Sequence, residues 1–406
     1  MNIIKINDTS NKLFYIGGVV RDELLGRESL DVDITYVGNA IEYCSKFGEV
    51  VQENSDFGTV RVVINPFQNF SNSNPDNDKN QSSQREKRQK FTVDFASTRS
   101  ESYPKKGHLP VVKKIGCSLK EDVLRRDFTI NALAKSVTTG EIVDYVGGLN
   151  DLENKKLRVL HDESFIDDPT RIIRGLKFAV RFGFELEEHT KKLQDEYLAN
   201  INYDMSYKRV KKELIETFQP SLPSFCDTSF NIGVMGRIAF EKFINQKIYK
   251  LVTPNDVEVP KVDLEGLVKK YCTPHSVGTV EHVAIWLVYV GILGDLSRLP
   301  LTKVEQKILD DVPKEVLKTD FELYKTFEKA RIETILLYAI LKDEKGARHY
   351  LDDLRNIKLE INGQDLQNLG IKPSPKYQNI FDEVLKAKLK NPSMTKKDEI
   401  DVAILV

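Results

Sequence analysis

The sequence has 406 residues, of which 40% are hydrophobic and 30% charged, values typical of a globular protein whose length allows two to four domains. The formal net charge of −1 excludes a globally basic nucleic-acid-binding protein, so an RNA or DNA partner would need local basic patches. Four widely spaced cysteines without a C-x-x-C pair argue against a zinc site or a disulfide framework and favour a reducing compartment.

The start of the chain lacks the charged-then-apolar pattern of a signal peptide. No apolar run is long enough to cross a bilayer. We therefore expect a cytoplasmic protein that does not associate with membranes.

Residues 1–150 predict a mixed α/β domain. Short connections favour antiparallel or mixed strand pairing over a doubly wound sheet. A helix is expected over Asn39–Phe47. The expected strands are Phe14–Ile16, Asp31–Thr35, Gly58–Ile64, Phe91–Ala96 and Glu141–Tyr145.

The stretch Tyr15–Thr35, YIGGVVRDELLGRESLDVDIT, contains the most informative pattern. Because side chains alternate along a strand, Asp31 and Asp33 point to the same face. Two carboxylates held close together repel each other unless a cation lies between them, and oxygen ligands suit Mg²⁺ together with substrate phosphates. The alternative is an exposed strand face, because D-x-D is a short motif.

The Gly17-Gly18 pair precedes a predicted helix. Glycines let backbone N–H groups approach a phosphate, and a helix start adds favourable partial charge. Arg21 lies three residues later and could face the same anion. The combination predicts a nucleoside triphosphate beside a metal site, whereas the glycines alone would indicate a tight turn.

Residues 66–90 are rich in Asn, Ser and Gln and predict a disordered insertion, because such a segment buries too little apolar surface to fold. In the strand that follows, Asp94 alternates with Val93 and Phe95. It could add a third carboxylate to Asp31 and Asp33, as two-metal nucleotidyl transfer requires, or remain an exposed strand residue.

Ser100–Lys114 is expected to be a loop, because Pro and Gly interrupt it. The stretch LKEDVLRRDFTINAL follows. Asn131 lies four residues after Asp127, which predicts one helical face for both. With Arg125 and Arg126, this face suits contacts to a triphosphate and a ribose, although it could be an ordinary exposed helix face.

Beyond about residue 150 the pattern is helical, and the segment FIDDPTRIIRGLKFAVRFGF stands out. Asp168 before Pro169 predicts a helix start, which places Arg171 one turn later. A carboxylate beside a guanidinium matches a base edge with an amino group beside a ring nitrogen, as in cytosine and adenine. Uracil and guanine present the reverse order, so the pair could accept CTP and ATP and reject UTP and GTP, although the helix start alone would account for Asp168.

Two later segments could contact RNA. Asn202–Gln219 predicts a helix with Lys208, Arg209, Lys211 and Lys212, a local basic patch or an ordinary surface. Ile361–Lys390 predicts two helices around a turn, ending in Lys386, Lys388 and Lys390, which could hold an RNA backbone by shape or close a helical bundle.

Taken together, the motifs YIGGVVRDELLGRESLDVDIT, VDFASTR, VLRRDFTINALA and DDPTRIIRGLKFAVRFGF closely resemble those of class II tRNA nucleotidyltransferases, the CCA-adding enzymes, and of the related bacterial poly(A) polymerases. The resemblance is dense over residues 14–190 and sparse over roughly 215–355. It implies an α+β fold, with a polymerase-beta-like nucleotidyltransferase head (a mixed sheet with helices) followed by an all-helical neck, body and tail. The implied bounds are 1–150, 151–215, 216–355 and 356–406, with the tail binding tRNA.

The resemblance also implies roles for individual residues. Asp31 and Asp33 match the metal-binding carboxylates, and Asp94 matches an acidic strand position with a catalytic role. Asp168 and Arg171 match the base-selecting E-D-x-x-R, in which Asp167 replaces the Glu. The nucleotide-binding positions implied in addition are Gly17, Gly18, Arg21, Asp22, Arg99, Arg126, Asp127, Asn131 and Arg174.

The implied reaction is metal-dependent and template-independent. The 3′-hydroxyl of tRNA attacks the α-phosphate of CTP or ATP, with Mg²⁺ held by Asp31 and Asp33, and pyrophosphate leaves. The tRNA is held by its 3′ end and acceptor/T-arm, and the protein is a monomer or homodimer. We favour CCA addition, because Ser100–Leu124 has the usual family length and CC-adding members tend to lack part of this segment. ESYPKKGHLP is similar to A-adding members, so A addition is the second hypothesis, followed by poly(A) synthesis and then by a catalytically silent RNA-binding protein.

Overall fold

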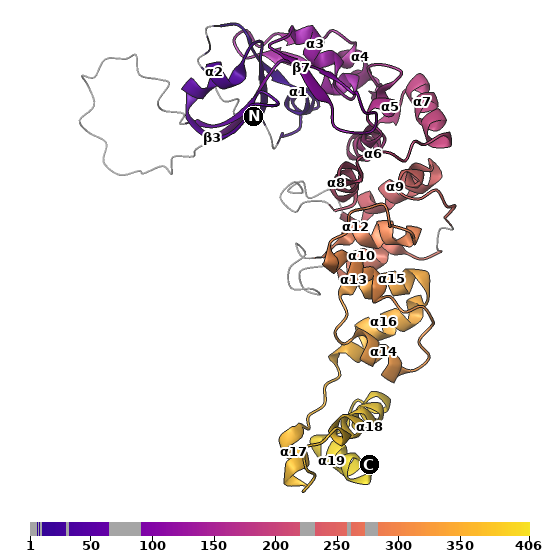
Figure 1. Ribbon diagram of the computed structural model, residues 1–406. Helices are drawn as coiled ribbons and strands as arrows, with labels where there is room; N and C mark the ends of the chain where they lie inside the picture. Colours follow the sequence, from indigo (N-terminus) through magenta and orange to yellow (C-terminus); the bar gives the residue numbers. More distant parts are fainter. Residues whose placement is uncertain are drawn as a thin grey trace, which may run out of the picture. The chain divides into compact units, whose positions relative to one another are not determined.

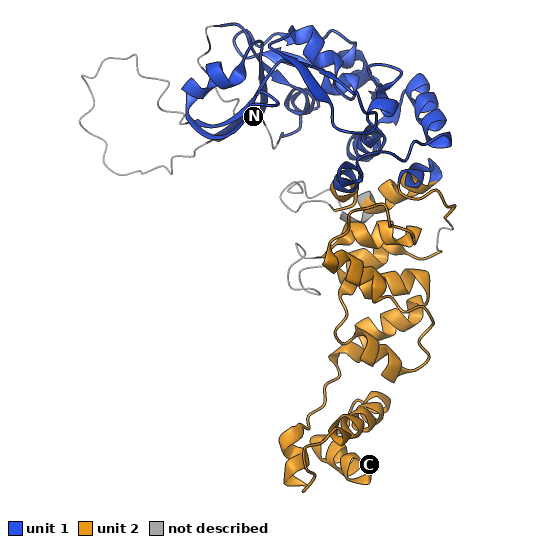
Figure 2. Cartoon of the chain, in the orientation of Figure 1, with its two compact units in different colours: residues 1–213, 245–251 blue, residues 214–244, 252–406 orange. Residues whose placement is uncertain are grey.

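The computed structural model describes residues 6, 8, 10–29, 32–64, 91–219, 232–257, 261–272 and 283–406. Figure 1 shows its helices and strands, and the chain divides into two compact units (Figure 2). Unit 1 comprises residues 1–213 and 245–251, and unit 2 comprises residues 214–244 and 252–406. Asp31 and the predicted insertion 66–90 lie outside the described residues.

Unit 1 is built on a seven-stranded sheet of order β3-β4-β5-β2-β1-β8-β9. β2 and β5 are parallel and the other neighbours are antiparallel, so the predicted mixed sheet is confirmed. Its strands are β1 Leu13–Ile16, β2 Asp33–Tyr36, β3 Glu49–Asn54, β4 Thr59–Ile64, β5 Phe91–Ser97, β8 Ala134–Ser136 and β9 Ile142–Val143.

The period-two pattern places the polar strand residues on one face of this sheet. Val93 and Phe95 of β5 are almost fully buried, and Asp94 between them is half-exposed. Apolar alternation thus anchors one face in the core and leaves the other for chemistry.

The segment Ser100–Lys114, predicted to be a loop, instead contributes to an antiparallel two-stranded ribbon of β6 Arg99–Ser102 and β7 Val111–Ile115. The prediction was wrong because Pro104 and Gly107 interrupt only the connection between the strands, where no ladder hydrogen bond is lost. A further parallel pair joins β10 Lys156–Leu157 to β11 Glu185–Leu186.

Helices pack on the buried side of the sheet and continue after it. One apolar cluster joins Ile16 and Ala134 of the sheet to Leu119 and Val123. The helices of unit 1 are α1 Gly18–Leu24, α2 Ala40–Cys44, α3 Leu119–Leu124, α4 Gly148–Glu153, α5 Ser164–Asp167, α6 Thr170–Phe182 and α7 Glu188–Ala199, with the 3₁₀ turns η1 Ser45–Phe47, η2 Thr129–Asn131 and η4 Ile248–Leu251.

The described residues of unit 2 contain helices and no strands. α8 Tyr207–Phe218 begins in unit 1 and ends in unit 2, and it is shorter at its start than predicted. The remaining elements are α9 Ile232–Asn245, α10 Leu264–Tyr271, α12 Ile285–Val290, η6 Gly291–Leu293, α13 Lys303–Asp310, α14 Asp320–Phe327, α15 Ile332–Leu341, α16 Glu344–Asp352, η7 Leu354–Asn356, α17 Gly363–Asn368, α18 Lys376–Lys390 and α19 Lys396–Leu405.

The last three helices share one small core, which includes Leu366, Val384 and Ala403. Lys388, predicted to belong to a basic helix end that could hold RNA, is instead buried, with its ammonium 2.7 Å from Glu399. Helical periodicity turns this lysine inward, where a carboxylate can compensate its charge.

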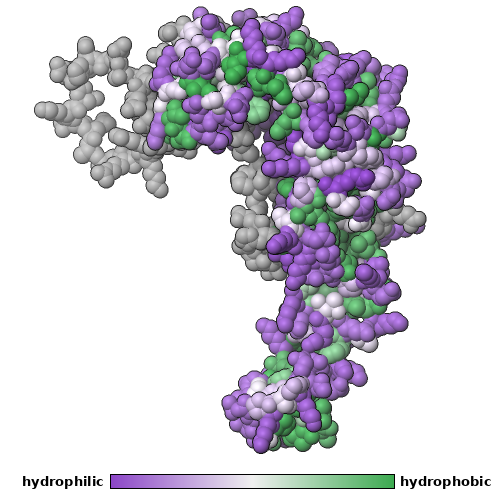
Figure 3. All heavy atoms as spheres, viewed as in Figure 1, coloured by the Kyte–Doolittle hydropathy of each residue, from purple (hydrophilic) through white to green (hydrophobic). Residues whose placement is uncertain are grey.

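Hydrophilic residues cover much of the face seen in Figure 3. Among the described residues, no helix combines the length and the apolar character that crossing a bilayer requires.

Candidate active site

The Gly-Gly turn lies directly after β1. Gly17 has a φ of +73°, a conformation that favours glycine, and its N–H donates to the carbonyl of Leu133. A Cβ at Gly17 would lie 3.0 Å from Nη1 of Arg126. Glycine at this position therefore sets the backbone and lets the Arg126 side chain approach the start of α1, which begins at Gly18.

Asp33 and Asp94 lie side by side on the sheet. They are register partners of the parallel strands β2 and β5, so both side chains point to the same face. Asp33 is exposed. Asp94 forms a bidentate ion pair with Arg61 of β4, at 2.6 Å from Nε and 2.8 Å from Nη2. The structure thus brings together two of the three predicted carboxylates, and the third, Asp31, lies outside the described residues.

A cleft of about 400 Å³ opens over these carboxylates. Its lining combines the two acids with arginines from β4, β6 and the segment after α3, namely Arg61, Arg99, Arg125 and Arg126. Carboxylates and guanidinium groups around one cleft suit a metal–triphosphate complex, because the acids offer oxygen ligands and the arginines neutralise phosphate.

The fit to a divalent cation rests on this donor set. Asp33 and Asp94 provide carboxylate oxygens of the kind that Mg²⁺ prefers, and Mg²⁺ usually takes only one or two carboxylates besides phosphates and water. Within the part of the chain that the structure describes, no group of three or more His, Cys, Asp or Glu side chains is placed to hold a metal ion. Asp33 and Asp94 are a described pair of carboxylates that fits the predicted ion.

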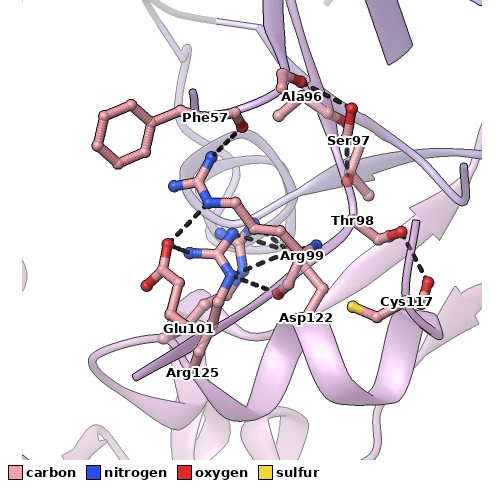
Figure 4. A network of polar contacts seen from close by, with 12 residues as sticks. Phe57, Ala96, Ser97, Thr98, Arg99, Glu101, Cys117, Asp122 and Arg125 are labelled. Carbon is pink, nitrogen blue, oxygen red and sulfur yellow. Dashed lines mark hydrogen bonds and ion pairs between the residues drawn. The ribbon is translucent and has the colours of Figure 1, made fainter. Parts of the chain in front are cut away.

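Buried acids fix the arginines of the cleft (Figure 4). Asp122 of α3 is fully buried, accepts from Nη2 of Arg125 at 2.8 Å and lies 3.3 Å from Nη2 of Arg126. Burial acts to raise the pKa of the Asp122 carboxyl, but these two arginines outweigh it and hold the pKa below its ordinary value. Sequence analysis missed Asp122, although its i, i+3 and i, i+4 spacing to the arginines was a usable signal.

Arg99 belongs to the same network. Its Nε donates to Glu101 at 2.7 Å and its Nη1 to the carbonyl of Phe57 at 3.0 Å. Glu101 also accepts from Arg125 at 3.1 Å. The ribbon strand β6 therefore supplies a buried acid that orients two arginines at the cleft edge, and this role had no signal in the predicted loop.

The Nε–H of Arg126 is buried and has no hydrogen-bond partner among the residues that the structure describes. Such a group normally finds a partner, because an unpaired buried donor costs about 1–3 kcal/mol. Its place at the cleft, beside Gly17, makes Arg126 a donor suited to a bound anion.

Arg21 is buried rather than exposed on the turn. Its guanidinium lies 2.7 Å from Asp22 and donates to Asn131 at 2.5 Å, and it stacks over the ring of Phe182, with 4.4 Å from Cζ to the ring centroid. Asn131 in turn donates to Asp127 at 3.0 Å. These four polar residues thus form one network behind the turn.

Asp127 and Asn131 meet for a different reason than predicted. α3 ends at Leu124, and Asn131 closes the 3₁₀ turn η2, so the two residues share no helical face. They are brought together by the irregular turn between α3 and β8. Arg174 of α6 lies 2.6 Å from Asp127 and, with Asn131, holds the pKa of this carboxyl below its ordinary value despite its burial.

Asp168 is buried at the start of α6, and its Oδ1 accepts from the N–H of Thr170 at 3.2 Å and from its hydroxyl at 2.6 Å. α6 begins at Thr170, directly after Pro169, which is close to the predicted helix start. Arg209 of α8 donates to Oδ2 of Asp168. The basic patch predicted on α8 is therefore partly directed inward.

Arg171 is buried beside Asp168. Its Nη1 donates to the hydroxyl of Ser164 at 2.6 Å, and its Nη2 donates to the carbonyl of Arg125 at 3.0 Å and to the hydroxyl of Tyr103 at 3.2 Å. Asp167 accepts from Lys106 of the ribbon connection at 2.5 Å. These contacts link the predicted base-selecting pair to the segment Arg125–Asp127 and to the β6–β7 ribbon. The spacing of these residues in the sequence could not predict that connection.

The fold and the cleft define a nucleotidyltransferase head, in which carboxylates on adjacent strands lie beside a Gly-Gly turn and fixed arginines. Residues 13–158 match the family model of the poly(A) polymerase head domain. A solved CCA-adding enzyme in an apo form has the same fold, with a TM-score of 0.74, 23% identity and coverage of 97% of this chain and 91% of that chain.

Two curated relatives extend the likeness. An A-adding tRNA nucleotidyltransferase of Geobacter sulfurreducens is 30% identical over 97% of this chain. The match covers 45% of that protein, so this chain spans less than half of its length. A CCA-adding enzyme of Bacillus pumilus is 26% identical, with 98% of this chain and 93% of that protein covered. Residues 13–158 are thus similar to the poly(A) polymerase head domain, and nearly the whole chain is similar to A-adding and CCA-adding tRNA nucleotidyltransferases.

Proposed function

We propose that this protein adds C, C and A to the 3′ end of tRNA, using CTP and ATP and releasing pyrophosphate. The main support is the pairing of Asp33 with Asp94 on one sheet face, under a cleft that also contains Arg126 beside the Gly17 turn. Solved CCA-adding enzymes in complex with tRNA, CTP or ATP have this fold.

Asp31 and Asp33 would hold Mg²⁺. When bound, the ion polarises the α-phosphate and lowers the pKa of the attacking hydroxyl. Asp94 would act as the third carboxylate, with its orientation set by Arg61. The side chains of Asp33 and Asp94 keep the reacting end of the cleft negative, which favours binding of a cation rather than of bare triphosphate.

The triphosphate would bind at the start of α1, through the backbone of Gly18 and the side chain of Arg126. Arg99 would contribute from the cleft edge. The remaining predicted nucleotide-binding residues would hold this turn in place, because they bond chiefly to one another: Arg21, Asp22, Asp127, Asn131 and Arg174.

Asp168 and Arg171 would select the base. A carboxylate oxygen can accept about two hydrogen bonds, so Oδ2 of Asp168 can take an exocyclic amino group in addition to Arg209. Arg171 would donate to the neighbouring ring nitrogen. Arg209 and Thr170 fix the acid, and a fixed template rejects UTP and GTP strongly, because their edges would leave buried groups unpaired.

We assign the head to residues 1–150, the neck with the base-selecting pair to 151–215, the body to 216–355 and the tail to 356–406. The tail would bind the tRNA acceptor/T-arm as the protein works on the 3′ end, either as a monomer or as a homodimer. A cytoplasmic location follows from this activity, because its substrates are there.

The test is nucleotide incorporation with purified protein and Mg²⁺. The substrates are tRNA lacking CCA, tRNA ending in CC, and oligo(A), each with CTP, ATP or both. We expect two C and one A on the first tRNA, and one A on the second. Incorporation of A without C would refute CCA addition, and incorporation on oligo(A) alone would favour poly(A) synthesis.

A addition to tRNA ending in CC is the second candidate. The ribbon sequence ESYPKKGHLP and the name of the Geobacter sulfurreducens relative both favour it. The same experiment separates the two functions, because an A-adding enzyme extends only the tRNA that already ends in CC. Stable tRNA binding with no incorporation on any substrate would favour a catalytically silent RNA-binding protein.

A further inference from the structure

A row of polar side chains crosses the sheet on both sides of Asp94. Gln52 of β3 pairs in register with Arg61 of β4, Arg61 pairs with Asp94 of β5, and Asp94 pairs with Asp33 of β2. All four residues line the same cleft, which therefore extends beyond the carboxylates toward the sheet edge formed by β3.

The two ends of the cleft differ in what they offer. On one side of Asp33 and Asp94 lie β1, the Gly17 turn and Arg126, where the triphosphate is proposed to bind. On the other side lie β4 and β3, with Arg61, Gln52 and Asn54 in the cleft wall. In phosphoryl transfer the attacking and leaving oxygens lie roughly in line across the phosphorus. If pyrophosphate leaves toward the turn, the attacking hydroxyl arrives from the side of β4.

We propose that Arg61, together with Gln52 and Asn54, forms a subsite for the phosphodiester backbone at the 3′ end of the RNA substrate. This inference rests on the proposed function, which supplies the RNA and the direction of attack. Arg61 contacts the RNA and orients Asp94, whereas Gln52 and Asn54 hydrogen-bond the sugar or phosphate oxygens.

The geometry of Arg61 suits both tasks. Its Nε and Nη2 bond the two oxygens of Asp94, which holds the planar guanidinium in the cleft wall. The side chain is 47% exposed, so it can reach a phosphate without leaving Asp94. Its positive charge also offsets the repulsion that Asp94 would exert on an incoming phosphodiester.

The polar wall beside Arg61 adds neutral contacts. Gln52 and Asn54 belong to the edge strand β3, all of whose residues are exposed, and Thr59 of β4 lines the cleft nearby. Amide side chains donate and accept hydrogen bonds, which suits backbone and sugar contacts that do not depend on sequence.

The test compares Arg61→Gln with the wild type in tRNA binding, without Mg²⁺ or nucleotide, over a series of salt concentrations. We expect roughly five- to tenfold weaker binding of tRNA ending in CC. The slope of log K for tRNA binding against log salt concentration should also be smaller by about one, because one phosphate contact is lost. ATP binding should be unchanged. With tRNA trimmed of its terminal single-stranded nucleotides, the variant and the wild type should bind equally.

Arg158→Gln is the matched control. Arg158 is 43% exposed, like Arg61, and pairs with the buried Asp151 at 3.0 Å and with Glu187 at 3.2 Å, but it does not line the cleft. This variant should bind tRNA as the wild type does. Arg61→Lys should recover part of the affinity, because lysine keeps the charge and loses the planar fork.

Asp94→Asn separates RNA contact from loss of the ion pair. It breaks the pair but keeps Arg61, so tRNA binding should be preserved or stronger. Equal weakening by Arg61→Gln and Asp94→Asn, at unchanged melting temperature, would overturn the subsite, as would an equal deficit on trimmed tRNA. The proposed function is tested separately. If the expected binding differences between the wild type and Arg61→Gln are found but the wild type transfers no nucleotide, the proposed function is refuted and the subsite stands.

Discussion

The carboxylates of the cleft and those behind it differ in burial more than in chemistry. Asp94 pairs with an arginine and its side chain is 45% exposed, whereas those of Asp127 and Asp168, which also pair with arginines, are 10% and 7% exposed. The buried acids accept several hydrogen bonds from the protein itself. Exposed acids keep coordination sites for a ligand, and buried ones fix the groups around it. We therefore expect substitutions in the two regions to fail in different ways.

Asp33→Ala should have the largest effect on activity. Loss of a metal-binding carboxylate should lower kcat by about 10³-fold or more, because the ion supplies several kcal/mol of transition-state stabilisation. tRNA binding and the melting temperature should stay unchanged, since Asp33 is exposed. Single-turnover incorporation measures the first effect, and Asp162→Ala, an exposed acid elsewhere in unit 1, is the control. A parallel loss of tRNA binding would contradict the metal role.

Asp127→Asn should act on stability instead. It removes the charge that Arg174 faces at 2.6 Å, and breaking such a partly buried pair costs about 2–4 kcal/mol. Urea unfolding of this variant and of Asp94→Asn measures the contrast, and the exposed Asp94 pair should change stability by less than about 1 kcal/mol. Equal costs at the two positions would remove the distinction between the regions.

The same contrast predicts acid sensitivity. Asp122 and Asp127 have pKa values below the ordinary 3.8 in the folded protein. Their contribution to stability is therefore complete well above 3.8, begins to fall as the pH approaches that value, and is lost as the pH falls on through their lower folded-state pKa values. The urea midpoint should therefore drop between about pH 5 and pH 3. Asp127→Asn should show a smaller drop than the wild type over this range. A midpoint that rises on acidification would show that other groups dominate.

Asp168→Ala tests whether a buried acid can also set specificity. The change removes the acceptor for an exocyclic amino group and the partner of Arg209. We expect slower transfer of C and A, and a loss of about 10- to 100-fold in discrimination against UTP and GTP. Competition between ATP and GTP in one reaction reports the ratio directly. Unchanged selectivity in a slowed enzyme would leave Asp168 with a structural role only.

Gly17→Ala should have the smallest effect. A side chain at a φ of +73° with Arg126 at 3.0 Å costs about 1 kcal/mol of stability. The displaced arginine should raise KM for ATP about tenfold or less, and kcat should change little. Gly26 has a similar φ of +67°, and a Cβ there would meet no atom within 4 Å. Gly26→Ala should therefore show the stability cost without the effect on KM.

The sequence by itself determined the periodic features of this protein. Alternating apolar residues placed β4 and β5 correctly to within one residue, because burial of one sheet face demands that pattern. The start of α6 was visible from Asp168 and Pro169, because both residue types favour the first positions of a helix. The D-x-D, Gly-Gly and RRD motifs could be recognised because each is local. The ribbon β6–β7 was missed, since its strands are short and their pairing is not encoded in a single stretch.

Only the tertiary structure decided which charges meet. Asp33 and Asp94 are 61 residues apart and lie side by side because β2 and β5 are parallel neighbours. Arg61 reaches Asp94, Arg209 reaches Asp168, and Asp122 holds Arg125 and Arg126. A charged side chain has the same local sequence signal whether it binds a ligand or a buried partner, because its energy depends on burial and on distant residues, which are properties of the folded chain.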